Sequence, residues 1–480
     1  MLTHGFSPSN LLSATIIPIP KDKRKSLNNS TNYRGIALSS VISKVLDLVI
    51  LNTNRHVLDT CELQFGFKSK HSTTQCTYVI NEIVQYYINN DTNVFVMMLD
   101  CSKAFDRVHY VKLFSLLSKK GLCPLITRLL AFIYTNQSLS IKWANECSDK
   151  FSVSNGAKQG GILSPILFTV YIDELFIQLK QSNVGCYVGD KFMGAFGYAD
   201  DSTILAPTLT SLKLMLRICD EFGKKFNVLF NVSKYQFLDY CKDQDEMLNC
   251  IHLNGNFIKT QQYAMHLGHP VGQAASDVAI EQGTNSFVTT VNGVLSYFSY
   301  AHIDVKYKLF KIFCMPLYGC ILWDFWSKTM KRFCIQWRKC LRKLLNLSPL
   351  CHSKYLPLIV NDMPLDVQLY KRFIKFICNI INSDNSCVSL CGKMMLAGSN
   401  SIPCRNLNNI AYSFKIDKYK LISSFDDWPT MSKLYVEKLY CEDDYCTIGN
   451  IKDLLYIRDN NTTCFKVSEL DHMITNVCTN

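Results

Sequence analysis

Two adjacent aspartates, Asp200 and Asp201, stand between apolar residues in the segment FGYADDSTILAP. A third, Asp100, directly follows VFVMML, an apolar run with the length of a buried strand. Neighbouring carboxylates repel each other, but their oxygens together would suit Mg²⁺, and two such ions support phosphoryl transfer. The alternative is a solvated hairpin tip, because aspartate is common in tight turns. The spacing leaves open whether Asp100 meets the pair in space.

The elements that must position these aspartates are indicated by apolar periodicity and by turn residues. We expect strands at 11–20 and 94–99, and a strand, a tight turn and a second strand across 194–206. Residues 30–52 predict a turn followed by a helix of about fifteen residues. Another helical stretch is expected to end near Asn89. The aspartates therefore fall at strand ends and in a turn.

Composition sets the broad class of the protein. The chain has 480 residues, of which 48% are hydrophobic and only 19% charged, as in an ordered protein of two to four domains. Its net charge of +12 favours polyanionic partners without proving them. The 22 cysteines are scattered, and neither a signal peptide nor a long apolar run is evident. We therefore expect reduced thiols, no membrane span and an intracellular protein, in the nucleus or the cytoplasm, rather than a secreted one.

A series of motifs closely resembles the reverse transcriptases of non-LTR (LINE-class) retrotransposons. The motifs occur in that family's order over roughly residues 10–330, and the last of them is similar to the start of the thumb. They are NYRGIALSSVISKVLD, LQFGFKSKHSTTQ, MMLDCSKAFDRVHY, NGAKQGGILSPILFTVYIDEL, FGYADDSTILA, FNVLFNVSKYQFL, HLGHPVG and LYGCILWDFW. A lone ADD triplet means little, but seven ordered fingers and palm motifs make coincidence negligible.

The resemblance implies an α+β fold, the right-hand polymerase with fingers, palm and thumb. An antiparallel palm sheet flanked by helices would carry the site, and a mainly helical C-terminal region would follow. The implied division is fingers at 1–90, palm at 91–272 with inserted fingers elements around 121–160, thumb at 273–350, and an extension at 351–480 that matches no motif.

The resemblance also assigns chemistry to the aspartates. Asp100, Asp200 and Asp201 would be the catalytic carboxylates holding two Mg²⁺ or Mn²⁺ ions, with the backbone carbonyl of Cys101 as a further ligand. Asp200 would be the stricter ligand of the pair. A primer 3′-hydroxyl would attack the α-phosphate of a deoxynucleoside triphosphate on an RNA template and release pyrophosphate. Lys234 is either a proton donor to that pyrophosphate or an ordinary solvated lysine.

Three residues are implied to contact the incoming nucleotide. Phe105 would lie beneath the sugar, where a ribose 2′-hydroxyl would clash, although an aromatic residue near a helix start is more often part of a core. Gln159 would contact the sugar and base, and Gly160 would admit the backbone closely. Asp106, beside Phe105, is expected to be structural rather than a metal ligand.

Basic residues are implied to contact phosphates, although each is also consistent with a solvated surface. Arg34 and either Lys21 or Lys23 would meet the triphosphate; the run KDKRK also resembles a nuclear-import patch. A basic segment with interleaved aromatics in the implied thumb would track the phosphates of a template–primer duplex, an RNA–DNA hybrid included. Its residues are Lys331, Arg332, Arg338, Lys339, Arg342 and Lys343.

Three functions remain open. The first is an RNA-directed DNA polymerase, and the second is a truncated, catalytically inactive, nucleic-acid-binding protein derived from a retroelement. The third, an RNA-templated RNA polymerase, is disfavoured by Phe105. We expect no endonuclease ahead of the fingers motif. The pairs Cys387/Cys391 and Cys441/Cys446 lack the spacing of a zinc knuckle and are expected to serve packing.

Overall fold

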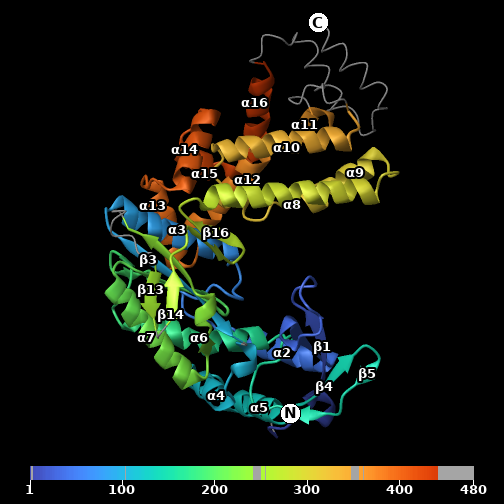
Figure 1. The fold of residues 1–480 in the computed structure, drawn as a ribbon, viewed down its shortest axis with the longest axis vertical. Helices are drawn as coiled ribbons and strands as arrows, with labels where there is room; N and C mark the ends of the chain where they lie inside the picture. The colour runs from blue at the N-terminus through green and yellow to red at the C-terminus, as the bar shows by residue number, and fades with distance from the viewer. Residues whose placement is uncertain are drawn as a thin grey trace. The chain divides into compact units, whose positions relative to one another are not determined.

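The computed structural model describes residues 1, 4–102, 104–241, 250–253, 256–347, 356–360 and 362–441. The chain divides into two compact units, Met1–Leu267 and Gly268–Asn480 (Figure 1). In the described part of the chain, no helix is both long and apolar enough to cross a membrane. Buried cysteines of unit 1 with free thiols are Cys76, Cys101, Cys186 and Cys219.

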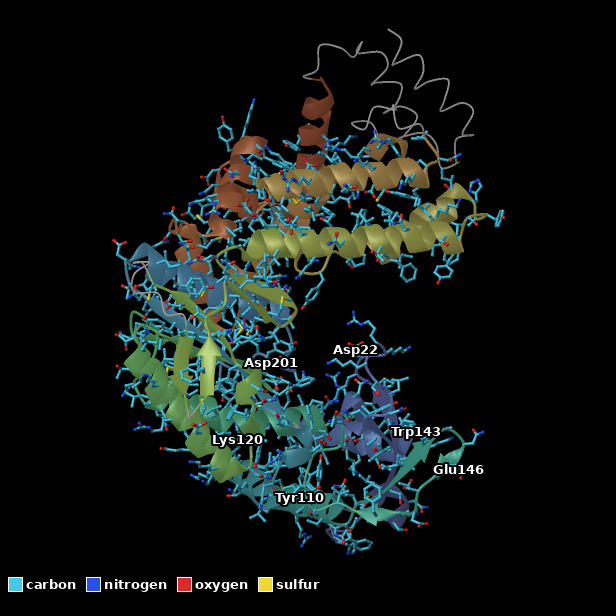
Figure 2. The ribbon with its side chains drawn as sticks, in the orientation of Figure 1. Asp22, Tyr110, Lys120, Trp143, Glu146 and Asp201 are labelled. Atoms are coloured by element: carbon cyan, nitrogen blue, oxygen red, sulfur yellow. The ribbon has the colours of Figure 1, made fainter. Side chains whose placement is uncertain are left out.

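The first sheet of unit 1 is built around β1 (Ser13–Pro20), which pairs antiparallel with β2 (Tyr33–Ser39) and parallel with β4 (Ser138–Trp143). Two short strands complete it, β5 (Glu146–Cys147) and β6 (Phe151–Ser152). Trp143 and Glu146, labelled in Figure 2, are register partners on the β4–β5 hairpin. Strands from residues 13–39 and strands from residues 138–152 therefore share one sheet.

The turn predicted before the helix in residues 30–52 is wrong for most of its length. Residues 33–39 form β2, whose seven residues pair with β1 from Tyr33 opposite Pro20 to Ser39 opposite Ala14. Pairing buries Ala37 against Ala14 and Leu139 in a small core. This tertiary pairing outweighs the local turn signals of the segment. The helix α2 (Val41–Thr53) then follows, as expected.

The second sheet of unit 1 has β3 (Val94–Ser102) at its centre. On one side β3 pairs with β10 (Asp201–Ala206), which pairs with β9 (Ala195–Tyr198). On the other side it pairs with β11 (Leu229–Phe230) and β12 (Gln236–Tyr240), and all these pairings are antiparallel. Residues 94–99 are buried, which explains their continuous apolar run. The predicted strand at 94–99 and the hairpin across 194–206 are confirmed.

Helices flank this second sheet. The helix α3 (Thr73–Asn89) begins at a capping box made by Ser72 and Gln75 and ends where the sequence predicts, and both α3 and α6 (Ser164–Gln181) contact β9. Helix α7 (Leu209–Phe226) contacts β10. The remaining helices and strands of unit 1 are α1 (Ser9–Leu12), α4 (Tyr110–Lys119), α5 (Pro124–Thr135), β7 (Tyr187–Val188), β8 (Lys191–Phe192), β13 (Cys250–Leu253), β14 (Asn256–Lys259) and β15 (Tyr263–His266).

Unit 2 is mainly helical. Trp323 lies at its centre, packed edge-on against Phe333 at 5.4 Å between ring centroids and against Gly283 of the long helix α8 (Ala275–Tyr297). Its other elements are β16 (His269–Gly272), α9 (Ile303–Leu309), α10 (Lys328–Leu344), α11 (Leu356–Ile359), α12 (Leu365–Ile381), α13 (Ser386–Leu396), α14 (Ile402–Phe414), α15 (Lys418–Ser423) and α16 (Trp428–Cys441).

The α+β fold class with an antiparallel sheet flanked by helices is confirmed, and the described residues beyond 350 are mainly helical, as expected. Cys387 and Cys391 are both buried in α13. The side chain of Cys441 and all of Cys446 lie outside the described residues.

Candidate active site

The three aspartates meet at one end of the second sheet. Asp201 is the register partner of Asp100 across the β10–β3 pairing and of Tyr198 across the β10–β9 pairing. Asp200 lies in the tight turn that joins β9 to β10. Register partners on adjacent antiparallel strands point to the same face, so the sheet itself brings Asp100 and Asp201 together. Figure 2 labels Asp201 at this position.

Electrostatics within the cluster reflect this crowding. Loss of hydration, followed by the charges of Asp200 and Asp100, raises the pKa of Asp201 to about 6, while Lys234 acts in the opposite direction. Loss of hydration also raises the pKa of Asp200; the charge of Asp100 adds to the increase, and Arg34 and Lys234 oppose it. The cluster therefore carries a free-energy cost when it ionises, and a cation would remove that cost.

Lys234 is placed directly on this cluster. Its Nζ lies 2.9 Å from Oδ2 of Asp100. The short 3₁₀ turn that carries it, Val232–Lys234, is capped by the Asn231 side chain, and the Asn231 N–H donates to the Asp100 carbonyl at 2.9 Å. In the structure Lys234 therefore forms an ion pair with Asp100. Its role as a proton donor stays a prediction.

The cluster has the oxygen donors that Mg²⁺ or Mn²⁺ prefers. Among the residues that the structure describes, no three His, Cys, Asp or Glu side chains form a ready-made ligand set for one ion. Burial, followed by the charges of Asp200 and Asp100, raises the pKa of the Cys101 thiol well above its usual value. The thiol is therefore neutral, which leaves its backbone carbonyl as the donor from that residue. The chemistry of the carboxylates fits divalent cations.

A cavity of about 430 Å³ lies beside Asp100 and Asp201. One wall comes from β3 and β10, and the other from the segment 233–236 together with residues near His266. Nδ1 of His266 lies 2.8 Å from Oγ1 of Thr77, which fixes the ring on α3. The residues that β15 and its neighbours contribute were not predicted from the sequence, because no local pattern links them to the aspartates. They are Gln261, Met265, His266 and Leu267.

Phe105 begins a 3₁₀ turn, Phe105–Arg107, and is half-buried. Its ring stacks on Phe168 of α6 at 4.8 Å between centroids. Its carbonyl accepts a hydrogen bond of 2.7 Å from the N–H of Ala157, in the glycine-rich loop. Asp106 follows on the same turn and is exposed. The ring of Phe105 is thus packed on Phe168, while part of the side chain remains exposed. Both predicted roles, contact with the sugar and packing in the core, stay open.

The glycine-rich loop is docked on β2. The Gln159 carbonyl accepts a hydrogen bond from the N–H of Ala37 at 2.6 Å. Gly160 has a φ of +102°, and a Cβ there would lie 2.9 Å from the Ala37 carbonyl oxygen. Only glycine combines this backbone conformation with so close an approach. The loop that carries Gln159 is therefore fixed against the strand that carries Arg34.

The predicted triphosphate cations occupy different places. Arg34 is exposed on β2, and its charge helps to lower the pKa of Asp200 against the effect of burial, so it lies near the carboxylates. Lys21 and Lys23 lie in the loop between β1 and β2. There Nζ of Lys21 donates to the Thr31 carbonyl at 2.9 Å, and Asp22, labelled in Figure 2, pairs with Arg24 at 3.1 Å. Of these three cations, Arg34 is the one whose charge lowers the pKa of Asp200.

The predicted basic surface of unit 2 belongs to the helix α10. Its apolar stripe, which includes Phe333 and Trp337, is buried, and five of the six cations are exposed. Arg342 is half-buried. Burial raises the pKa of Asp366 on α12, and the charge of Arg338 opposes that effect, so Arg338 lies near an acidic group of unit 2. The exposed cations are Lys331, Arg332, Arg338, Lys339 and Lys343.

Comparison with known proteins places this geometry in context. A family model described as reverse transcriptase (RNA-dependent DNA polymerase) matches residues 19–272. The chain is 24% identical over 230 residues to a Pol polyprotein of the retrotransposable element R2DM of Drosophila melanogaster, covering 48% of this chain and 22% of the relative. It is 28% identical over 213 residues to a probable RNA-directed DNA polymerase from transposon X-element of the same organism, covering 42% of this chain and 23% of the relative.

The chain thus spans about a fifth of the length of the curated relatives it matches. Among solved structures it is similar to a telomerase from Candida albicans, with a TM-score of 0.41 and 10% identity over 88% of this chain and 66% of that one.

Removing one carboxylate should stabilise the metal-free protein. The pKa of Asp201 rises from 3.8 to about 6 on folding, so its ionisation opposes folding fully above pH 6 and hardly at all below pH 4. We expect Asp201→Asn to raise the free energy of unfolding at pH 7.5 by about 1 kcal/mol. This is less than the pKa shift alone would give, because the side chain is partly open to solvent, which screens its charge. The gain should be smaller at pH 4.5. Urea unfolding in a chelating buffer measures it.

The control is Asp190→Asn, which changes an exposed aspartate in the β7–β8 connection. At both pH values, this variant should have the same free energy of unfolding as the unsubstituted chain. An equal effect of the two substitutions would show that the cluster carries no special repulsion.

Proposed function

The chain belongs to the reverse transcriptase (RNA-dependent DNA polymerase) family, and on this premise we propose that it extends a primer 3′-hydroxyl with deoxynucleotides on an RNA template. The observation that carries the proposal is the register of Asp100 opposite Asp201, with Asp200 in the adjoining turn. Three carboxylates at the end of a buried sheet are suited to phosphoryl transfer with divalent cations. The relatives that match residues of this chain are retrotransposon polymerases of the non-LTR class.

Asp100, Asp200 and Asp201, with the Cys101 carbonyl, are the residues that would hold two Mg²⁺ or Mn²⁺ ions. Such ions, when bound, activate the attacking hydroxyl and neutralise charge on the phosphate. Asp200, at the turn and within reach of the Arg34 charge, would be the stricter ligand of the pair. Nζ of Lys234 lies beside the carboxylates, and we expect it to give a proton to the leaving pyrophosphate.

The remaining residues would bind and orient the substrates. Arg34 would contact the triphosphate, and Gln159 would contact the sugar and base. Phe105 would lie against the sugar, where a ribose 2′-hydroxyl would clash with the ring. Lys21 or Lys23 would add a weaker charge from the β1–β2 loop. The cavity beside Asp100 would hold the primer terminus, because it opens at the same carboxylates. Positioning of this kind supplies much of the catalysis in phosphoryl transfer.

We assign fingers to 1–90, palm to 91–272, thumb to 273–350 and an extension of unknown role to 351–480. Pairing of β4 with β1 supports the placement of residues around 121–160 with the fingers. The RNA template and a DNA primer, or their hybrid, would be the partners, with deoxynucleoside triphosphates as substrates. We place the activity inside the cell, in the nucleus or the cytoplasm.

Primer extension tests the proposal directly. The full 480-residue chain should extend a DNA primer annealed to RNA when Mg²⁺ and deoxynucleotides are supplied. Asp200→Asn should lower the rate by about 100-fold or more, because it removes a charge from the reacting centre. Asp190→Asn, the exposed control, should retain the rate. Duplex binding by the unsubstituted chain without any extension would contradict the proposal and favour an inactive nucleic-acid-binding protein.

Sugar selection separates the two roles left open for Phe105. If the ring contacts the sugar, Phe105→Ala should raise ribonucleotide incorporation relative to deoxynucleotide incorporation by about 10-fold or more, since one steric clash is removed. Phe114→Ala, which truncates another half-buried aromatic in unit 1, should leave that ratio unchanged. Single-nucleotide incorporation with matched ribo- and deoxynucleotides measures it. An unchanged ratio for Phe105→Ala would mean that the ring packs in the core and does not select the sugar.

Salt dependence tests the α10 surface. Neutralising Lys331, Arg332, Lys339 and Lys343 together should weaken duplex binding nearly equally for all sequences, because phosphates carry no base identity. The slope of log affinity against log salt should flatten by up to about 0.9 for each lost contact. The control neutralises the same number of exposed cations on α7, namely Lys213, Arg217, Lys224 and Lys225. Equal slopes for the two variants would mean that α10 presents only a solvated face.

A further inference from the structure

The turn that carries Asp200 is held by one buried amide, and we propose that Gln64 is the positioning residue for the catalytic turn of the polymerase proposed above. Gln64 lies 135 residues before Ala199 and is fully buried. It touches neither a carboxylate nor a substrate position in any observed contact. Its effect on nucleotide transfer would come through the backbone of the turn.

Both backbone polar groups of Ala199 are bound by the Gln64 side chain. Oε1 of Gln64 accepts from the Ala199 N–H at 3.0 Å, and Nε2 lies 3.4 Å from the Ala199 carbonyl oxygen. The same Oε1 accepts from the N–H of Gly66 at 2.8 Å, which orients the amide. One side chain thus takes the place of the strand partner that Ala199 lacks in the β9–β10 turn.

The turn needs such a restraint because of its backbone conformation. Ala199 has a φ of +56°, in the left-handed region that a residue with a Cβ seldom adopts. The register pairs of β9 and β10 end at Tyr198 and Asp201 and leave Ala199 and Asp200 outside the ladder. Without the Gln64 amide, this pair of residues has access to other turn conformations, and Asp200 would move with them.

The segment that carries Gln64 approaches the hairpin as an extra strand. The Phe65 N–H donates to the Gly197 carbonyl at 2.7 Å, and the Gly197 N–H donates to the Leu63 carbonyl at 2.9 Å. A Cβ on Gly66 would lie 2.3 Å from the Ala199 nitrogen. Glycine at that position therefore permits an approach that any side chain would block.

The same segment is anchored to the body of unit 1. The Cys61 N–H donates to both carboxylate oxygens of Asp173 on α6, at 2.9 and 3.1 Å. Nζ of Lys120, a residue labelled together with Asp201 in Figure 2, lies 3.7 Å from Asp173. Lys68 Nζ donates to the carbonyls of Thr60 and Cys61, each at 2.7 Å. A fixed segment is what allows Gln64 to hold the turn rather than to follow it.

The first test observes the turn without any catalysis. Gln64→Met keeps the side-chain volume but removes the bonds to Ala199. Backbone hydrogen exchange of the metal-free full chain should then be faster at Ala199 by about 10-fold or more, while the paired residues 202–204 keep their protection. The matched control is Gln137→Met, which removes another buried amide in unit 1, bonded to the Tyr110 hydroxyl, and should leave Ala199 unchanged.

The second test measures nucleotide transfer. Gln64→Met should lower the single-turnover incorporation rate by about 10- to 100-fold, the range expected for a displacement of about 1 Å at a reacting centre. Duplex affinity should stay within about twofold, because the binding surfaces are untouched. Gln137→Met should retain the rate even if it lowers thermal stability equally. Gln64→Glu keeps an acceptor for the two N–H groups. Hydrogen exchange at Ala199 should therefore be slower in this variant than in Gln64→Met.

The outcomes separate this inference from the polymerase proposal. No extension by the unsubstituted chain would contradict the polymerase proposal, while the exchange result at Ala199 would still decide whether Gln64 holds the turn. An active chain in which Gln64→Met changes neither Ala199 exchange nor the incorporation rate would overturn the inference alone. A rate loss equal to that of Gln137→Met would also overturn it, because it would reflect stability only.

Discussion

Mutual repulsion among Asp100, Asp200 and Asp201 is the constraint that the rest of unit 1 must satisfy. The strand register holds two of the carboxylates opposite each other, and the turn adds the third. Burial increases the cost of charge on Asp200 and Asp201, and the positive charge of Lys234, which pairs with Asp100, offsets part of it. A protein selected for stability alone would replace such a cluster with neutral residues. Its presence, held by buried strands on both sides, is the physical argument for a cation-dependent site.

Local patterns predicted the parts of this site whose structure depends on nearby residues. The apolar run VFVMML lies buried in the central strand, the hairpin across 194–206 has strand and turn propensity in the right order, and α3 ends at Asn89. Each of these depends on periodicity or on turn residues within about ten positions. The helix α10 was not predicted as an element, although its apolar residues recur at helical spacing.

Other parts depend on partners far along the chain and could not be predicted in this way. β2 was expected to be a turn, since nothing local shows that residues 33–39 pair with β1 and lie near the loop of Gln159. Gln64 belongs to the motif LQFGFKSKHSTTQ, but its contact with Ala199 spans 135 residues and no local pattern predicts it. The same holds for His266, which lines the cavity beside the aspartates. The family resemblance supplied the meeting of Asp100 with the pair, which spacing had left open.

The site also depends on a connection between the two sheets of unit 1. Arg34 lies on the first sheet and the carboxylates lie on the second, so the distance between them is not set by either sheet alone. The glycine-rich loop links them, because Gln159 accepts a hydrogen bond from β2 and the chain continues directly into α6, which packs on β9. Asp47 of α2 adds a long contact of 3.5 Å to the N–H of Leu163 at the start of α6. The residues of this loop therefore fix the position of the cation on one sheet relative to the anions on the other.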